Sequence, residues 1–482
     1  MSALKDGFFN LVILALSALD VIYLGWLWEG TLITGAPGSG KSTCSGRQLA
    51  IGLLSVPEMG GLVLTAKAEE TQNWIRYAKE CGRESDLIIF NADSGHCFDP
   101  LHYEWTRPGR GAGDLESIID LFSTLVSIGK ADVGHGHDPF WERGNEQLMR
   151  NVIQLLDLAD ERISIASIDR VIKSLPTRPD QHEETAWQKD SYCAQLINSI
   201  RSRQDTLTAE QWSDLDFATQ FIFKKWPAFD ERPRSSLEMT WSGMADKFLF
   251  NPLNRLFCSG KCTFTPEMTT HQRKIVICDF PHLEYGPDTG RLLNVLPKLI
   301  FQRAWLRRDL NASPNPVFLW QDEFQYFVTR RDNFFQQTCR GSRVAVVCLT
   351  QNILNLSEEL GEAQPGSKTK SFLGNLAIKI FHQQNEHETC QYAADQIGRE
   401  YRYLDNFSGS SGASNQSHFS SGASRQLAHI VEPIEFTRLA KPDAVSPLAQ
   451  AIVYQSGKTF NASKTERNPR GSNWLPVFFS RE

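Results

Sequence analysis

Residues 31–43 read TLITGAPGSGKST, and this stretch decides the fold. Its first four residues predict a short buried strand, and the next eight, 35–42, match the phosphate-binding pattern GxxxxGK[ST] in full. A glycine-rich turn that matches by chance is the alternative, but the motif stands between a strand and a predicted helix, where phosphate binding requires it. The predicted nucleotide-binding residues are Gly35, Ala36, Pro37, Gly38, Ser39, Gly40, Lys41, Ser42 and Thr43.

Each part of this loop has a role in holding a nucleotide. Glycines let the loop curl so that its N–H groups face phosphate oxygens, and the N-terminus of the following helix adds a partial positive charge. Lys41 is expected to reach the β- and γ-phosphates, and the Ser42 hydroxyl is expected to ligate Mg²⁺. The expected cofactors are therefore ATP and Mg²⁺.

The second half of such a site is an acid at the end of another buried strand. Residues 317–323, VFLWQDE, supply it. Asp322 is predicted to hold Mg²⁺, and Glu323 to orient and deprotonate the attacking water. A small-molecule kinase has no use for a water-activating glutamate, and the NKxD sequence that reads guanine in GTPases is absent. The pattern predicts an ATP-hydrolysing enzyme, with a chance acidic pair as the alternative.

A third predicted element is the strand 344–350, which is followed by Gln351. Because ligands in such sheets bind at the carboxyl ends of the strands, the Gln351 amide is a candidate sensor of the γ-phosphate. An ordinary polar loop residue is the alternative. Arg340 and Arg343 precede this strand and are candidates for a finger supplied to the ATP of a neighbouring subunit. A solvated helix face is the alternative for each arginine.

The rest of the chain predicts an α/β fold. Apolar runs rich in β-branched residues recur at 31–34, 62–65, 87–90, 274–280, 317–321, 344–350 and 377–381. Such runs are typical of parallel strands that are buried on both faces. The sequence predicts a RecA-like P-loop NTPase of the additional-strand class with a central, mainly parallel sheet. Its nucleotide-binding domain is expected at 30–111 and 251–482. An all-helical insertion domain is expected at 112–250, where strand signals nearly vanish.

The N-terminal residues 1–29 predict a hydrophobic helix, because residues 8–28 are long and largely apolar. Asp6, Asn10, Ser17 and Asp20 would share one narrow face of that helix. This pattern fits a helix that packs against its own protein, and it also fits a membrane anchor whose polar stripe faces partner helices. The predicted strand at 31–34 follows almost without a linker, which favours the packing helix.

Composition and low-complexity segments limit the remaining possibilities. The chain has 482 residues, a net charge of −6 and ten cysteines that are scattered singly, which fits two or three domains in a reducing cytoplasm. The net charge excludes a globally basic nucleic-acid coat, so any DNA contact has to be local. Residues 408–424 contain eight serines in seventeen positions and predict a flexible surface loop.

The order of these motifs resembles the type IV secretion coupling proteins, the TraG/TraD-like ATPases of conjugative DNA transfer. The resemblance runs from about residue 30 onward. It includes TAKAE at 65–69 in place of a DPKGE-like segment, DPL at 99–101 in place of NPL, and the closing region at 425–443. The chain departs from the family at its N-terminus, where two membrane spans are usual. Membrane association is therefore an open question.

The resemblance implies a homo-hexameric ring with ATP at the subunit interfaces and DNA in the central channel. The helical domain would face a relaxosome or another cargo, and secretion-channel proteins are further candidate partners. The leading hypothesis is therefore a DNA-translocating motor located in the cytoplasm or at the cytoplasmic face of the inner membrane. A duplex-DNA pump like FtsK or HerA, outside secretion, is the first alternative. An ATP-dependent switch or scaffold that recruits protein partners is the second.

Overall fold

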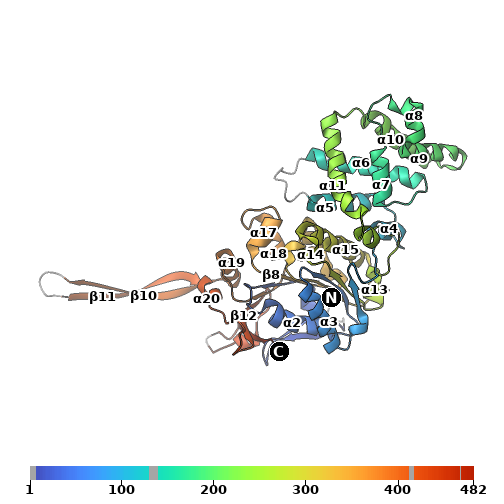
Figure 1. Cartoon of the computed structure of the whole chain (residues 1–482). Coiled ribbons are helices and arrows are strands. Elements are labelled where there is room, and N and C mark those ends of the chain that lie inside the picture. Colours follow the sequence, from blue (N-terminus) through green and yellow to red (C-terminus); the bar gives the residue numbers. More distant parts are fainter. Residues whose placement is uncertain (1–6, 130–138, 412–416, 467, 482) are drawn as a thin grey trace. The chain divides into compact units, whose positions relative to one another are not determined.

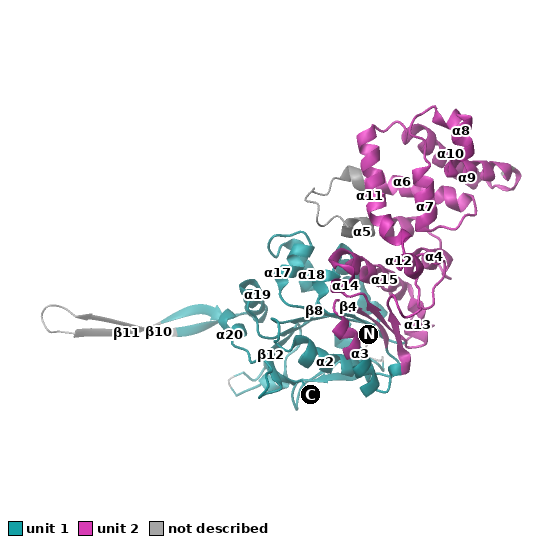
Figure 2. Cartoon of the chain, viewed as in Figure 1, with its two compact units in different colours: residues 1–59, 74–84, 315–482 teal, residues 60–73, 85–314 magenta. Residues whose placement is uncertain are grey.

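The computed structural model describes residues 7–129, 139–411, 417–466 and 468–481. The chain divides into two compact units whose segments alternate along the sequence (Figure 2). The first unit comprises residues 1–59, 74–84 and 315–482. The second unit comprises residues 60–73 and 85–314.

The main sheet of the first unit has the strand order β13-β12-β9-β3-β8-β7. Its strands are β3 Thr31–Thr34, β7 Val317–Gln321, β8 Val344–Thr350, β9 Ile378–Phe381, β12 Leu448–Gln455 and β13 Trp474–Ser480. The neighbours β9, β3, β8 and β7 pair in parallel, whereas β12 is antiparallel to both β9 and β13. Because β8 lies between the P-loop strand β3 and the acid strand β7, the predicted additional-strand fold is confirmed.

Burial explains why these strands form. All residues of β3, β7, β8 and β9 are buried, as expected for short apolar runs with helices on both faces of a parallel sheet. Trp74 stacks on Phe318 of β7 with 5.6 Å between the ring centroids. At the other side of the sheet, Phe381 and Ile452 join a core cluster with Phe436 and the alanines of α19.

The helices of the first unit are short and connect these strands (Figure 1). They are α1 Leu24–Leu27, α2 Arg47–Leu54, α16 Arg330–Thr338, α17 Ile353–Glu359, α18 Ser367–Gly374, α19 His387–Ile397 and α20 Pro433–Thr437. A capping box between Thr329 and Asp332 starts α16. The division between the units falls within α3, Ala68–Glu80.

The second unit contains three parallel strands and most of the long helices. Its strands are β4 Gly60–Thr65, β6 Ile275–Asp279 and β5 Leu87–Phe90, with β6 between the other two. Phe90 packs edge-on against Phe257, Phe264 and Phe280 with centroid distances of 5.0–5.2 Å, which seals one end of this sheet. The neighbouring helices are α4 Pro100–Thr106, α12 Leu253–Phe257, α13 Pro266–His271, α14 His282–Tyr285 and α15 Pro287–Arg307.

Within the second unit, the described residues between 115 and 249 form helices and no strand. They are α5 Leu115–Gly129, α6 Pro139–Leu158, α7 Ile165–Lys173, α8 Thr185–Asp190, α9 Tyr192–Ser202, α10 Ala209–Gln220 and α11 Glu231–Leu249. Capping boxes at Ser164 and Thr208 start α7 and α10. The helical insertion is therefore present, while its domain limits of 112 and 250 stay a prediction, because the compact unit also contains the three strands.

The predicted helix over residues 8–28 is wrong. In the structure, β1 Val12–Ala15 pairs antiparallel with β2 Val21–Tyr23, and only α1 is helical. The backbone N–H groups of Leu19 and Asp20 donate to the Ser17 hydroxyl, both at 3.0 Å. Ser17 and Asp20, which would align on one face of a helix, therefore lie in the turn between β1 and β2, and Asp6 lies outside the described residues. None of the helices within the described residues combines the length and apolar character that a membrane span requires.

The loop predicted at 408–424 is also wrong for most of its length. β10 Arg399–Ser411 and β11 Ser417–His429 pair antiparallel along their whole length, and residues 412–416 lie outside the described residues. We call this element the β10–β11 ribbon. Serine and glycine have low strand propensity, but cross-strand backbone pairing is available to any residue except proline, and here it determines the conformation.

Candidate nucleotide-binding site

The P-loop lies directly after β3 and depends on its glycines. Gly38 and Gly40 have φ angles of +73° and +90°, which are strained for residues with a side chain. At Gly35, a Cβ atom would stand 2.2 Å from the Ser39 hydroxyl oxygen. The loop leads into one wide helical turn, Lys41–Gly46, and then into α2. The backbone therefore adopts the curled form that the motif predicts.

Residues 382–384, at the carboxyl end of β9, support this loop from the side. Ala36 N donates to Gln383 O at 2.8 Å, and His382 N donates to Thr34 O at 2.9 Å. His382 Nε2 lies 2.7 Å from the Ser45 hydroxyl. Burial, followed by the charge of Lys41, lowers the pKa of His382 to about 3, so the imidazole is neutral near pH 7.

Gln384 completes this support. With its amide oxygen facing Gly35, it accepts from Gly35 N at 2.9 Å and donates to Gln351 O at 3.1 Å. Our sequence analysis missed residues 382–384. Their position directly after the apolar run 377–381 is the signal that could have found them, because ligands bind beyond the carboxyl ends of such strands.

The two predicted acids follow β7 and lie beside the P-loop. Asp322 is 6% exposed and Glu323 only 1%. Lys41 Nζ lies 3.5 Å from Glu323 Oε1, so the lysine of the P-loop and the candidate base already meet. Glu323 has a left-handed backbone with φ of +52°, a conformation that costs a non-glycine residue about 1–3 kcal/mol. Strain of this kind concentrates at functional sites.

The oxygen atoms expected to bind Mg²⁺ are also adjacent. The Ser42 hydroxyl is hydrogen-bonded to the Asp322 carboxyl group, and Glu323 N donates to Asp322 Oδ1 at 2.9 Å. Burial raises the pKa of Asp322, and the charge of Lys41 opposes this effect. Mg²⁺ in nucleotide sites typically takes one or two protein carboxylates and completes its shell with water and phosphate oxygens. This donor pair fits that pattern.

Gln351 lies within hydrogen-bond distance of the same carboxylate. Its Nε2 atom stands 3.3 Å from Glu323 Oε1 and 3.5 Å from Oε2. Gln325 Nε2, which the sequence analysis did not single out, donates to Glu323 Oε2 at 3.0 Å. The structure thus brings Lys41, Glu323 and Gln351 together, although 310 positions separate the first from the last.

Arg340 and Arg343 are not part of this cluster. Arg340 lies in the turn Cys339–Ser342, and Arg343 directly precedes β8, so both stand at the amino end of the strand whose carboxyl end carries Gln351. A strand of this length spans roughly 20 Å. Arg340 Nη1 pairs with Glu29 Oε1 at 3.1 Å. Neither arginine can reach a nucleotide on its own P-loop, so a role at a neighbouring subunit's ATP stays a prediction.

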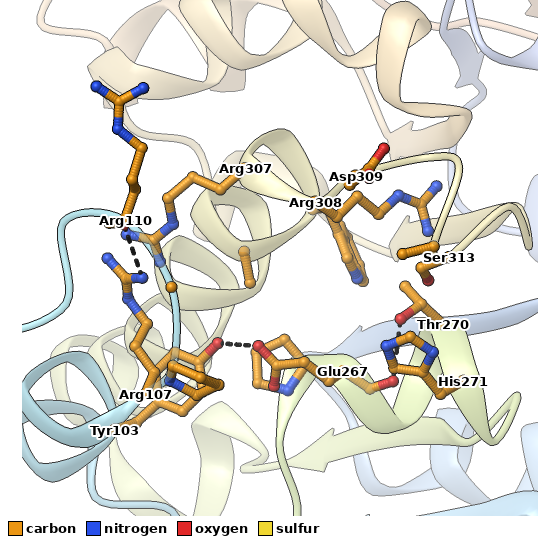
Figure 3. Close-up of a pocket in the computed structure, with 16 residues that line it drawn as sticks. Tyr103, Arg107, Arg110, Glu267, Thr270, His271, Arg307, Arg308, Asp309 and Ser313 are labelled. Atoms are coloured by element: carbon orange, nitrogen blue, oxygen red, sulfur yellow. Dashed lines mark hydrogen bonds between the residues drawn. The ribbon is translucent and has the colours of Figure 1, made fainter.

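A cavity of about 330 Å³ lies elsewhere, within the second unit, between α4, α13 and the end of α15 (Figure 3). Its charged lining is Arg107, Arg110, Arg307, Arg308, Glu267 and Asp309. Arg107 and Arg307 each lie 2.8 Å from the buried Glu104, and the Tyr103 hydroxyl donates to Glu267 at 2.5 Å. Because the buried Glu104 pairs with both Arg107 and Arg307, we assign these contacts a structural role.

The fold and the site together define a P-loop NTPase with a RecA-like core. Residues 316–441 match a family model described as "TraM recognition site of TraD and TraG". This segment contains Asp322, Glu323, Gln351 and residues 382–384. No curated protein matches the chain in sequence.

Solved structures of a plasmid coupling protein share the fold. A structure described as "Bacterial conjugative coupling protein TrwBdeltaN70" aligns with a TM-score of 0.57 at 13% identity, covering 96% of this chain and 87% of that one. TrwB in complex with ADP and Mg²⁺ aligns with a TM-score of 0.55 at 12% identity, covering 96% and 87%. TrwB with a non-hydrolysable GTP analogue gives 0.56 at 11% identity, covering 97% and 89%. The family model over residues 316–441 and the shared fold together confirm the predicted resemblance to the TraG/TraD-like coupling proteins.

Proposed function

We propose that this protein is an ATP-hydrolysing motor that translocates DNA, as a coupling protein in conjugative transfer or in a type IV secretion-like system. One observation carries the proposal. The P-loop lysine and a fully buried glutamate from another strand meet at 3.5 Å, beside a hydroxyl and a second carboxylate that suit Mg²⁺. Such a constellation suits hydrolysis, because it places a base next to the phosphate-binding loop.

Each residue of the site has its own role in the proposed reaction. The curled loop and Lys41 would bind the phosphates and stabilise the charge that develops on them. Bound Mg²⁺, held by Ser42 and Asp322, would neutralise charge on the β- and γ-phosphates. Glu323 would orient the attacking water and accept its proton. Gln351, at the end of β8, would contact the γ-phosphate. It would couple the loss of that phosphate to a motion of the sheet.

The proposed cargo, assembly and location rest on the resemblance to the coupling-protein family. The family resemblance supports a homo-hexameric ring with DNA in its channel, in the cytoplasm or at the cytoplasmic face of the inner membrane. The family description of residues 316–441 names a recognition site for TraM, which supports contact with relaxosome proteins. Arg340 and Arg343 are the candidates for a finger that acts across a subunit interface.

A nucleotide-dependent switch without turnover is the main alternative of a different class. The buried Glu323 argues against it, because a switch has no need of a base beside its Mg²⁺ ligand. A duplex-DNA pump outside secretion would use the same site, and strand polarity and end preference would distinguish the two motors.

The experiment is ATP hydrolysis measured with and without single- and double-stranded DNA. The wild type is compared with Glu323→Gln and with Glu358→Gln, a matched change of an exposed glutamate on α17. We expect DNA to stimulate turnover, Glu323→Gln to lower it by roughly 10²- to 10⁴-fold, the usual contribution of a general base, and Glu358→Gln to leave it unchanged. Turnover that depends on Glu323 but ignores both forms of DNA would contradict the DNA motor and favour a protein cargo.

A further inference from the structure

We infer that Gln325 is a positioning residue that holds the Glu323 carboxylate in place to orient the attacking water and accept its proton, and that Gln325 is itself held by Thr350. This inference rests on the proposed hydrolysis at Glu323. It assigns a role to a residue that lies two positions beyond the acid pair, in the short helical turn Phe324–Tyr326.

The geometry of Gln325 fixes its amide at both ends. Thr350 Oγ1 donates to Gln325 Oε1 at 2.8 Å, and Gln325 Nε2 donates to Glu323 Oε2 at 3.0 Å. The Thr350 hydroxyl also lies 3.1 Å from Asn352 O, so the contact with Gln325 is the shorter of the two. Gln325 is 4% exposed and Thr350 fully buried. An amide whose oxygen accepts from Thr350 has to present its N–H₂ group to the carboxylate.

Lys41 and Gln351, which also contact this carboxylate, are expected to have a second function. Both are expected to turn toward the phosphates of a bound nucleotide. Gln325 is anchored instead to Thr350, at the end of β8. It can therefore keep hold of Glu323 Oε2 while the other two donors engage phosphate. A catalytic group gains much of its effect from such fixed orientation.

The left-handed backbone of Glu323 makes this support necessary. At φ of +52° the residue has left the strand geometry of β7, so the direction of its side chain is not fixed by sheet pairing. Because Thr350 directly precedes Gln351, the same chain of hydrogen bonds also connects the candidate γ-phosphate sensor to the candidate base.

The test measures kcat and nucleotide affinity separately in isosteric variants. Gln325→Met keeps the volume and removes the amide, and Gln325→Glu presents a like charge to Glu323. We expect Gln325→Met to lower kcat roughly 10- to 100-fold, the scale of a misplaced catalytic group, with the Kd for a fluorescent ATP analogue unchanged within about twofold. Gln325→Glu should lower kcat further.

Two further variants connect the effect to the proposed chain. Thr350→Val removes the hydroxyl that anchors the amide, and it should lower kcat in the same direction but by less. Combined with Gln325→Met it should add nothing, because both changes break one chain of hydrogen bonds. The matched control is Thr219→Val on α10, a buried threonine whose hydroxyl donates, within the described part of the chain, to the carbonyl groups of Leu215 and Asp216 in its own helix. It should leave kcat unchanged.

The Glu323→Gln background decides between positioning and a general structural effect. There, Gln325→Met should cause no further loss. Wild-type kcat in Gln325→Met, losses that multiply with Glu323→Gln, or a loss confined to Kd would each overturn the inference, even if hydrolysis depends on Glu323. If Glu323→Gln turns over as fast as the wild type, the proposed function and this inference fail together. Thermal unfolding of each variant identifies a misfolded protein. If Gln325→Met is misfolded, the kcat of Thr350→Val relative to the wild type tests the inference instead.

Discussion

The nucleotide site and the β10–β11 ribbon belong to the same compact unit, yet they hold their side chains in opposite ways. At the site, Lys41, Asp322 and Glu323 are at least nine-tenths buried, and each is held by several neighbours. On the ribbon, Tyr401 and Tyr403 are 60% and 71% exposed. The ribbon extends beyond α19 and α20 (Figure 1).

The ribbon is held mainly by its own pairing. Its register runs from Arg399 opposite His429 to Ser411 opposite Ser417. Arg425 lies over the Tyr401 ring at 4.1 Å. An isolated two-stranded ribbon is marginally stable in water, because neither face is buried. The comparison teaches that one unit can combine a preorganised centre, where small displacements matter, with an arm whose surface tolerates change.

The largest effect should follow from Lys41→Ala. Removing a preorganised positive charge from the transition state should lower ATP turnover on the order of 10³-fold. Steady-state hydrolysis measures the effect, and Arg402→Ala at the base of the ribbon is the control, with turnover expected within about twofold of the wild type. A Lys41→Ala variant that keeps a tenth of the activity would show that the site is less preorganised than its geometry indicates.

Lys379 should make stability depend on pH. It is 2% exposed within β9, and burial lowers its pKa to about 8 from 10.5. Below pH 8 the folded state carries a buried charge. Between pH 8 and 10.5 the unfolded chain binds the proton and the folded chain releases it, so stability rises with pH by up to about 3 kcal/mol. Denaturant unfolding of Lys379→Met should lack this rise and show higher stability at pH 7. Parallel curves for both proteins would contradict the prediction.

Asp20→Ala should lower stability without changing catalysis. The Asp20 carboxylate accepts from the backbone N–H groups of Asn461 and Ala462, both at 2.7 Å. Loss of these two part-buried hydrogen bonds to a carboxylate should lower the free energy of unfolding by about 1–3 kcal/mol. Thermal unfolding and ATP turnover are measured on the same sample. A loss of turnover at an unchanged melting temperature would mean that the N-terminal hairpin affects the site directly.

The smallest effect should come from Tyr403→Lys on the ribbon. The side chain is exposed, so a charge there should change the free energy of unfolding by less than about 0.5 kcal/mol. The matched change in the sheet is Val347→Lys in β8, which should prevent folding or nearly so, because an unpaired charge would be buried. A loss above about 1 kcal/mol for Tyr403→Lys would show that something covers the exposed face of the ribbon.

The sheet and the core of the site were predictable because their signals are local. Val317–Gln321 and Val344–Thr350 are apolar on both faces, which only a doubly covered strand allows, and an acid or amide follows each one directly. The P-loop motif then fixes which edge of the sheet binds phosphate. These three pieces place Lys41, Glu323 and Gln351 at one edge without knowledge of the connecting chain.

The remaining features depend on contacts that the sequence does not display. Ser17 and Asp20 fit a helical stripe as well as a turn, and only the pairing of β1 with β2 decides between them. The serine-rich stretch at 408–424 has the composition of a loop, but its backbone finds a partner strand. The sequence alone gives no reason to single out Gln325 or Thr350. They come together because β7 and β8 are neighbours in the sheet.

The position of β3 has a consequence for how the protein is made. Its neighbours in the sheet are β8 and β9, which lie more than 300 residues later in the chain. At roughly 5–20 residues per second, a ribosome needs at least about 15 seconds to deliver them after β3 emerges. Until then β3, the strand that precedes the phosphate-binding loop, lacks both of its neighbours in the sheet. The proposed ATP site therefore cannot form until β8 and β9 have been synthesised, late in the production of the chain.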